Sequence, residues 1–374
     1  MATQTTAAPN GVVQWFEERV RATALFNALL HVPIPAEAKT YYLGGITLFL
    51  FMVQVATGTL LSLYYKPTPE AAYDSVKYIT SIVEFGWLIR SIHHWAANGM
   101  IIFLLLHVIR IFVQGVYKYP RELIWIFGAL LFAVTIGFGF TGYLLPWDQK
   151  AFWATTVGTE IAAAVPFIGE SLLQLLRGGA DVTDATLSRF FGMHVLVLPI
   201  SLALLLAAHL TVVHQLGIAN PKRPSLRPGQ LPTPGIVERW KPFFPHYVLD
   251  EVIAWAILLA LLVVAASVYP AGLEDKADAL VTPPHVKPEW YFLAVYQLLK
   301  VVPAIGPLTA RDVGILIPML AMVVLVMLPF LDKNPEVAKR KRPVALIIAA
   351  IVLIGMGILT WYGGQIPAVA VAAS

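Results

Sequence analysis

The chain has 374 residues, of which 58% are hydrophobic and only 13% are charged, and its mean hydropathy is +0.73. Soluble domains carry about 25% charged residues, so this composition excludes an ordinary water-soluble fold and predicts a membrane protein. There is no cysteine, which excludes disulfides, cysteine-ligated iron–sulfur clusters and covalently attached c-type haem in this chain. The net charge of +4 gives no indication of a nucleic-acid partner.

Seven apolar windows are long enough to cross a bilayer as helices, since about 20 residues are needed for one crossing. They lie at 41–64, 88–114, 123–145, 190–215, 252–269, 313–331 and 344–361. Residues 1–40 are predicted to form a polar tail and an interfacial amphipathic segment. The first ten residues lack the basic and apolar regions of a cleaved signal peptide.

The distribution of basic residues predicts how the chain is oriented. Sixteen of the 26 Lys and Arg residues fall on the side that holds the N-terminus, and the densest block, 339–342, directly precedes the last window. By the positive-inside rule the N-terminus is therefore cytoplasmic, on the negative (n) side, and the C-terminus lies on the positive (p) side. The p-side loops 146–189 and 271–311 hold apolar stretches too short to span, which predicts short interfacial helices around a cavity.

Four histidines fall at matching positions in two of the windows. His93 and His107 are 14 residues apart, and His194 and His209 are 15 apart. Fourteen helical residues rise about 21 Å and turn to within about 40° of four whole turns, so each helix presents two imidazoles on about one face. Two antiparallel helices of this kind would pair His93 with His194 toward the p side and His107 with His209 toward the n side. Iron of haem b accepts two axial imidazoles, so we expect two haems.

Glycines repeat at the same period in the windows that lack these histidines. The pairs, each 14 residues apart, are Gly44 with Gly58 and Gly128 with Gly142. Glycine lets a flat macrocycle approach a helix backbone where any Cβ would clash. Arg90 and Arg110 each lie three residues from a proposed ligand, which suits them to haem propionates.

Each of these features has a plainer interpretation when taken alone. A single membrane histidine could instead serve a proton relay or an interhelical hydrogen bond, and a secondary transporter built this way would hold no haem. Glycines of the small-xxx-small kind in membrane helices usually serve helix packing only. His94 points about 100° away from His93 and is interpreted as a neighbour of the ligand.

Motifs over nearly the whole chain from Trp15 resemble cytochrome b of the Rieske/cytochrome b quinol oxidoreductases, and the resemblance implies the same ligand pairs. The blocks are WFEER (15–19), YLGGITL (42–48), GWLIRSIHHW (86–95), LHVIRIF (106–112), YPREL (119–123), TGYLLPWDQ (141–149), MHVLVLP (193–199), TPPHVKPEWYF (282–292) and the final KRP.

Several blocks resemble the photosynthetic bf branch, which divides the protein into a four-helix and a three-helix chain. Here the two are fused, which implies an all-α transmembrane bundle of seven helices. Its expected parts are a four-helix diheme core at 41–216, an n-side connector at 217–251 and a three-helix, subunit-IV-like region at 252–374. TPPH, Tyr296 and His214 are more similar to the respiratory bc branch. Tyr42 stands where the bf branch has a cysteine for an extra c-type haem.

The resemblance also implies a reaction. Quinol is oxidised on the p side, and one electron passes to a Rieske iron–sulfur protein and a c-type cytochrome subunit. The other electron crosses through the two b haems to reduce quinone on the n side, coupled to proton translocation. The expected setting is a homodimeric complex in the lipid of a bacterial plasma membrane, in exchange with the quinone pool. The alternative is a diheme anchor without bifurcation, which needs no p-side cavity.

Residues of the two quinone sites follow from the same resemblance. Glu289 of PEWY is expected to accept a quinol proton, although it could simply be an interfacial acid that caps a helix after Pro288. Tyr143, Tyr291 and Tyr296 are candidate hydrogen-bonding walls, or else members of an interfacial aromatic belt. On the n side, His214 and Glu251 are expected to protonate reduced quinone.

Overall fold

The computed structural model describes residues 11–20, 33–35, 42–219, 240–283 and 286–365; the rest of the predicted tail and connector lies outside these ranges. Within them, seven helices are long and apolar enough to cross a membrane, which confirms the predicted all-α transmembrane bundle. They are Leu43–Ser62, Gly86–Gln114, Glu122–Leu144, Asp184–Leu216, Phe243–Val268, Ala310–Leu331 and Pro343–Gln365. A short helix, α1, covers Gly11–Val20 near the start of the chain.

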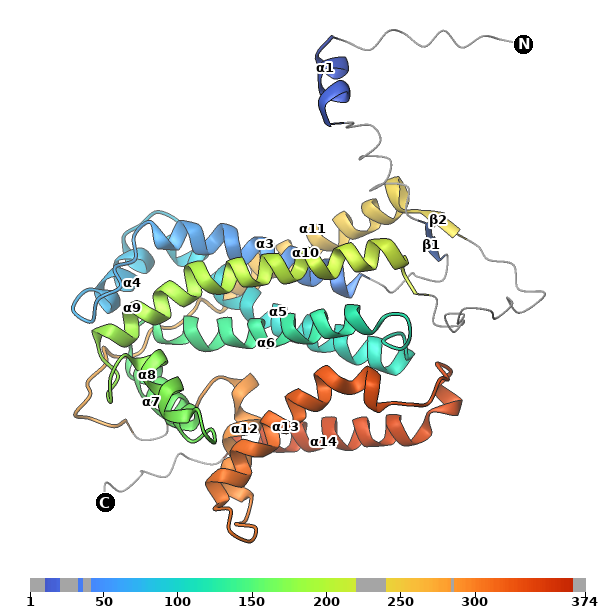
Figure 1. Cartoon of the computed structure of the whole chain (residues 1–374). Helices are drawn as coiled ribbons and strands as arrows, with labels where there is room; N and C mark the ends of the chain where they lie inside the picture. Colours follow the sequence, from blue (N-terminus) through green and yellow to red (C-terminus); the bar gives the residue numbers. More distant parts are fainter. Residues whose placement is uncertain (1–10, 21–32, 36–41, 220–239, 284–285, 366–374) are drawn as a thin grey trace, which may run out of the picture.

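Four of these helices form the core that contains the proposed ligands (Figure 1). They are α3 (Leu43–Ser62), α5 (Gly86–Gln114), α6 (Glu122–Leu144) and α10 (Leu198–Leu216). Helix α3 packs on α5, α10 packs on α6, and α5 meets α6. The interior is apolar: Leu50, Ala96, Leu131 and Leu202 form one buried cluster, as expected for helices that are hydrophobic on every face.

The fourth crossing is continuous but irregular. Helix α9 (Asp184–Gly192) runs into a π-helical segment, Met193–Val197, before α10 begins. Pro199 follows this segment, and proline has no N–H for a helical bond and clashes with the carbonyl four residues earlier. A widened turn at this place removes that conflict. The ligand candidate His194 lies inside it.

The three remaining crossings attach to different sides of the core. Helix α11 (Val248–Val268) packs on α5 and α3, whereas α13 (Ala310–Leu331) packs on α6. Helix α14 (Pro343–Gln365) packs on the shorter α12 (Trp290–Val301). Figure 1 shows α13 and α14 beneath α6, with α11 at the opposite side of the core.

Short helices occupy the two long loops at one end of the bundle, as the sequence predicts. They are α7 (Gln149–Ala163), α8 (Gly169–Arg177) and α12, beside α4 (Ala72–Ser81). The carboxylate of Asp148 caps α7 by accepting from the backbone N–H of Ala151 at 2.9 Å, which aims the first turn of α7 across the end of the core. We call this end the p end, after its predicted side.

The other end, the n end, holds an unpredicted pair of short strands. Strand β1 (Pro33–Pro35) pairs antiparallel with β2 (Trp240–Pro242). A single 3₁₀ turn, Lys339–Lys341, precedes α14. Each segment is too short for any periodicity to be visible in the sequence.

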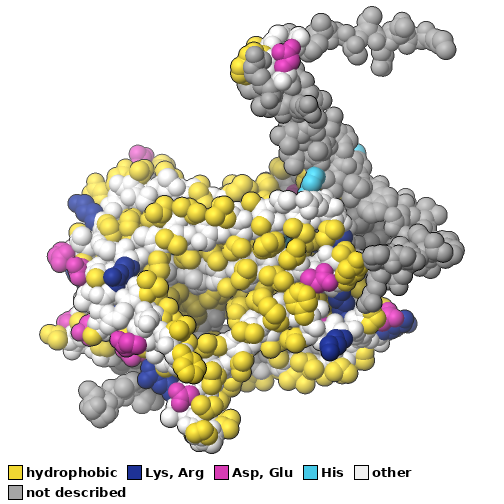
Figure 2. All heavy atoms as spheres, in the orientation of Figure 1, with side chains coloured by type: hydrophobic (Ala, Val, Ile, Leu, Met, Phe, Trp, Pro, Cys, Tyr) yellow, Lys and Arg dark blue, Asp and Glu magenta, His cyan; other side chains and the backbone are white. Residues whose placement is uncertain are grey.

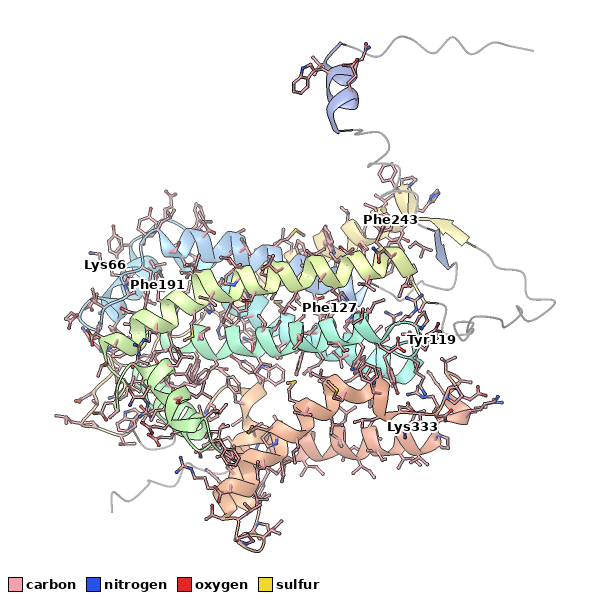
Figure 3. The ribbon with its side chains drawn as sticks, viewed as in Figure 1. Lys66, Tyr119, Phe127, Phe191, Phe243 and Lys333 are labelled. Atoms are coloured by element: carbon pink, nitrogen blue, oxygen red, sulfur yellow. The ribbon has the colours of Figure 1, made fainter. Side chains whose placement is uncertain are left out.

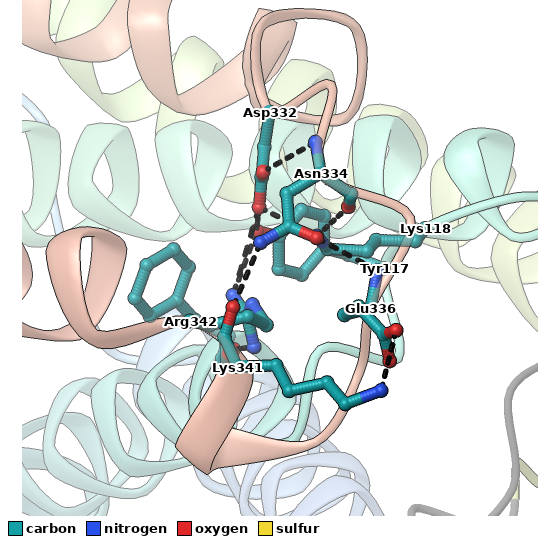
Figure 4. Close-up of polar contacts among 8 residues, drawn as sticks. Tyr117, Lys118, Asp332, Asn334, Glu336, Lys341 and Arg342 are labelled. Carbon is teal, nitrogen blue, oxygen red and sulfur yellow. Dashed lines mark hydrogen bonds and ion pairs between the residues drawn. The ribbon is translucent and has the colours of Figure 1, made fainter.

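A buried polar cluster at the n end joins the α5–α6 loop to the α13–α14 loop (Figure 4). Asp332 accepts a hydrogen bond from Tyr117 and forms an ion pair with Lys118 at 2.9 Å. Arg342 donates to the Tyr117 hydroxyl at 2.9 Å and is only 2% exposed. The last residue of the KRKR block is therefore a structural cation rather than a surface charge.

The molecular surface has the distribution expected of a protein in a bilayer. On the face in Figure 2, hydrophobic side chains cover the length of the helices and charged ones gather toward the two ends. In Figure 3, Lys66 lies at the p end, and Tyr119 and Lys333 lie at the n end. The chain is a multi-pass membrane protein, and seven apolar helices lie in the part of it that the structure describes.

Candidate functional site

The structure brings the predicted histidine pairs together, one pair near each end of the core. The ring centroids of His93 on α5 and His194 are 6.4 Å apart, with an angle of 66° between the rings. Metal–imidazole bonds are about 2 Å long, so an atom bound by both rings fits this separation. At the n end, His209 lies close enough to His107 to influence it electrostatically.

Each predicted glycine faces one of these imidazoles. The relevant distance runs from a Cβ placed on each glycine to Cε1 of the facing histidine. On α3 the distance is 3.3 Å from Gly44 to His107 and 3.2 Å from Gly58 to His93. On α6 it is 3.5 Å from Gly128 to His209 and 2.5 Å from Gly142 to His194. The sequence predicts room for a macrocycle at these glycines. The structure shows that the side chain they admit is the imidazole itself, because α3 and α6 pack directly on α5 and α10.

This arrangement could hold two haems of b type. Four imidazoles lie in two facing pairs inside an apolar bundle, each held against a helix backbone that has no side chain at that point. Haem iron takes four ligands from its macrocycle and needs only two from the protein. The donor set and the glycine contacts therefore fit the group.

Two hydroxyls that the sequence analysis missed contact the p-end pair. Thr57 Oγ1 lies 2.9 Å from Nδ1 of His93, and Thr141 Oγ1 lies 3.1 Å from Nδ1 of His194. The available signal was a Thr–Gly dipeptide at Gly58 and Gly142. Both threonines lie on the helices opposite their histidines.

The two arginines proposed for propionates differ in their surroundings. Arg90 donates to the backbone carbonyls of Ala271 at 2.7 Å and Gly272 at 2.5 Å, so it also fastens the segment after α11. Arg110 lies one turn beyond His107 and close enough to Tyr247 to influence it electrostatically.

Glu289 has a cationic partner that the sequence did not reveal. Its Oε1 lies 2.9 Å from Nζ of Lys150, and the two side chains are 21% and 33% exposed respectively. Glu289 occupies the N-cap position of α12, but its side chain makes no capping hydrogen bond. The simple capping role considered for it is thus not what the structure shows.

Two of the three candidate tyrosines lie near Glu289. The Tyr143 ring is 5.7 Å from Nζ of Lys150, and its hydroxyl is buried without a hydrogen-bond partner among the described residues. Tyr291 packs on Gly139, where a Cβ would lie 3.0 Å from its ring. Burial, with a further contribution from Glu289, raises the pKa of Tyr291. Tyr296 instead lies 4.1 Å from Nζ of Lys300.

A pocket of about 240 Å³ opens beside this group. Its lining residues come from α7, the loop before α12 and α12 itself: Lys150, Glu274, Pro283, Val286, Lys287, Pro288 and Leu293. Burial raises the pKa of Glu274, and the nearby Asp148 carboxylate raises it further. The p end thus combines a pocket, an ion pair and an unsatisfied hydroxyl.

At the n end, Glu251 lies against the backbone of α3. Its carboxylate occupies the place where a Cβ on Gly45 would be, one residue from the glycine that admits His107. The hydroxyl of Tyr42 donates to Asp250 at 3.0 Å, and the Tyr42 and Tyr247 rings are 5.2 Å apart. Burial and the Asp250 hydrogen bond raise the pKa of Tyr42 to about 12. His214 lies in the last turn of α10, at the same end.

Comparison with known proteins places the chain in a family. The family described as "Cytochrome b/b6/petB" matches residues 30–217, and "Cytochrome b(C-terminal)/b6/petD" matches 276–373. A "Cytochrome bc complex cytochrome b subunit" from Chlorobaculum thiosulfatiphilum is 40% identical over 348 residues, which cover 92% of this chain and 78% of that protein.

Two further relatives support the same family assignment. "Cytochrome b6" from Synechococcus elongatus is 45% identical over 213 residues, 57% of this chain and 99% of that protein. A solved structure titled "Hyperthermophilic respiratory Complex III" superposes with a TM-score of 0.82 at 32% identity, covering 95% of this chain and 92% of that one. These matches confirm the resemblance seen in the motifs. The chain therefore belongs to the cytochrome b/b6 family of bc/b6f-type quinol oxidoreductase complexes, with the N-terminal and C-terminal family regions in one polypeptide.

Proposed function

We propose that this chain is the diheme subunit that oxidises quinol at the p end and reduces quinone at the n end. One electron of each quinol goes to a Rieske iron–sulfur protein and onward to a c-type cytochrome, and the other crosses through this chain. The observation that carries the proposal is the set of four histidine–glycine contacts, two at each end of the core.

The chain's own contribution to electron transfer is to position two redox sites across the membrane. His93 with His194, and His107 with His209, are the residues proposed to hold the haems. Haem held there would supply a reversible one-electron carrier at each end. One charge moved across 100 mV corresponds to about 2.3 kcal/mol, so the transfer between the two ends stores redox free energy as membrane potential.

At the p end, quinol must lose two protons as it loses two electrons. Glu289 is the proposed acceptor of one proton, with Lys150 holding its carboxylate at the edge of the pocket before quinol arrives. The Tyr143 hydroxyl is proposed to bond a quinol oxygen, which its lack of a hydrogen-bond partner among the described residues supports. A diheme anchor without bifurcation would need none of these features.

At the n end, quinone takes up protons as it is reduced. His214 and Glu251 are the proposed donors, because both lie at the end of the core that holds His107. Arg90 and Arg110 are proposed to bind haem propionates at the p end and the n end respectively. The N-terminus is proposed to be cytoplasmic, in a bacterial plasma membrane, with the complex a homodimer.

An absorption experiment tests the ligand assignment. The purified wild-type complex is expected to give two b-type haems per chain by pyridine haemochrome, and His107→Leu is expected to lose a low-spin signal in the reduced-minus-oxidised spectrum. His94→Leu, adjacent to a ligand on the same helix, is the matched control and keeps both signals. If His107→Leu also keeps both, the assignment is wrong.

A further inference from the structure

The two proposed haem sites differ in how their imidazoles are held. At the p end, both Nδ1 atoms meet a threonine hydroxyl, at 2.9 Å for His93 and 3.1 Å for His194. At the n end, Nδ1 of His107 is buried with no hydrogen-bond partner among the described residues. Nδ1 of His209 is likewise buried without a hydrogen-bond partner among those residues. The backbone of Ile124 interacts with His209 as that of Phe138 does with His194, so the two ends differ in the threonine hydroxyls alone.

The direction of the p-end hydrogen bonds is fixed by the helices. Thr57 donates its hydroxyl proton to the Val53 carbonyl at 2.6 Å, and Thr141 donates to the Gly137 carbonyl at 2.9 Å. A hydroxyl has one proton, so each oxygen can only accept from its histidine. Nδ1 must therefore carry the imidazole proton, which leaves the lone pair on Nε2 for a metal.

The two ends differ in the type of residue that precedes each glycine. Thr57 and Thr141 precede Gly58 and Gly142, and both are nearly buried, at 9% and 4% exposure. Leu43 and Phe127 occupy the corresponding places at the n end, and neither side chain can accept a hydrogen bond.

We propose that Thr57 and Thr141 are positioning residues of the p-end haem site, which fix the tautomer of its two axial imidazoles and make them stronger electron donors than the n-end pair. The inference rests on the haem ligation proposed above. Hydrogen bonding at the outer nitrogen increases electron donation to the metal, and greater donation favours oxidised iron and lowers the reduction potential.

Potentiometric titration of the purified complex tests this, with the haem that survives in His107→Leu used to identify the p-end signal. Thr57→Val and Thr141→Val remove the hydroxyl and keep the shape. Each is expected to shift the p-end oxidation equilibrium roughly tenfold toward reduced iron, which is about 59 mV for one electron. The n-end potential stays unchanged.

Two control variants isolate the hydroxyl. Thr135→Val on α6 removes a hydroxyl that is 4% exposed and donates to Leu131 at 2.9 Å but serves no histidine, so neither potential moves. Thr57→Ser keeps the hydroxyl and retains the wild-type potential. The low-spin EPR spectrum, which depends on the angle between the imidazole planes, is expected to change in the valine variants only.

The outcomes separate this inference from the proposed function. Valine variants that hold both haems at wild-type potentials would overturn the inference. Loss of the p-end haem in Thr57→Val but not in Thr57→Ser would support it, whereas loss in both would show that packing, not the hydroxyl, matters. A wild-type complex without haem would instead contradict the proposed ligation.

Discussion

At the scale of single residues, the four proposed ligands differ from the neighbouring His94 in what lies opposite them. Each faces a glycine on a neighbouring helix. His94, next to His93 in the chain, lies beside Asn98 on its own helix instead. The sequence identified the glycines by their period, but only helix packing could show that they admit imidazoles.

The glycine–imidazole distances predict that replacing a glycine by alanine lowers haem content by different amounts at different sites. In Gly142→Ala the new Cβ would lie 2.5 Å from the imidazole of His194, so the ring must shift and p-end haem content is expected to fall strongly. Gly128→Ala, at 3.5 Å from His209, makes an ordinary contact and is expected to keep most of its haem. Haem per chain by pyridine haemochrome measures both.

Gly137→Ala on the same helix is the matched control, since its Cβ would meet only the two Leu198 methyls, at 3.7 and 3.8 Å. Equal haem content in Gly142→Ala and Gly137→Ala would contradict the proposed close fit.

A second prediction concerns Glu289. In Glu289→Gln the proposed proton acceptor is lost while the shape is kept, so the rate of quinol oxidation is expected to fall by about 10²-fold, the lower range for general base catalysis. Haem content stays unchanged. The measurement is quinol-dependent reduction of the haems from about pH 5 to about 9.

Lys150→Met tests the role of the ion pair between Lys150 and Glu289. Without the ammonium the carboxylate loses its ion pair, and the pH profile of quinol oxidation is expected to change. Lys287→Met, which lines the same pocket but donates to Gly364, is the control. If Glu289→Gln keeps the wild-type rate and pH profile of quinol oxidation, Glu289 is not the proton acceptor.

At the scale of elements, the fourth crossing explains a mismatch in the ligand spacing. Residues 15 apart on an uninterrupted α-helix are turned about 60° past four whole turns, yet His194 and His209 must face the same way. The π-helical segment Met193–Val197 takes up one extra residue. The spacing of 15 against 14 on α5 was the signal in the sequence, and Pro199 gives its local cause.

One alanine inserted after Leu204 is expected to abolish one haem site. The inserted residue lies in regular helix between His194 and His209, and it rotates these two side chains by about 100° relative to each other. Deletion of Leu196 is expected to keep both haems, because it replaces the widened turn by an α-turn and restores the 14-residue spacing found on α5. The haem spectrum distinguishes the two; an insertion variant with both haems would refute the geometric argument.

At the scale of the whole molecule, the C-terminal family region is held to the core by charge as well as by apolar packing. Asp332 after α13 lies between Lys118 and Tyr117 of the α5–α6 loop. Burial alone would raise the pKa of Asp332, but hydrogen bonds from Tyr117 and Lys118 outweigh it, so the pKa lies below its ordinary value.

Asp332→Asn leaves the buried Lys118 and Arg342 without their anion, which is expected to cost about 3 kcal/mol. Thermal unfolding at a fixed scan rate measures the loss. In the wild type, the stabilisation by Asp332 is complete above its unfolded pKa of about 3.9. It is lost as the pH falls through the lower folded pKa.

The exposed pair Glu336–Lys341, with side chains 39% and 63% exposed, supplies the comparison. Glu336→Gln is expected to cost less than about 1 kcal/mol, as surface ion pairs do. Equal losses in the two variants would show that the cluster does not fasten the C-terminal region.

The sequence by itself determined the seven crossings and the family, and it predicted the two histidine pairs, because hydrophobic length and helical period are local properties. Only the tertiary structure decided the rest. The Lys150–Glu289 pair joins α7 to α12, the Thr57–His93 contact joins α3 to α5, and Asp332 bridges two loops more than 200 residues apart. Such contacts depend on how helices pack, and no pattern within one segment records which side chain its neighbour presents.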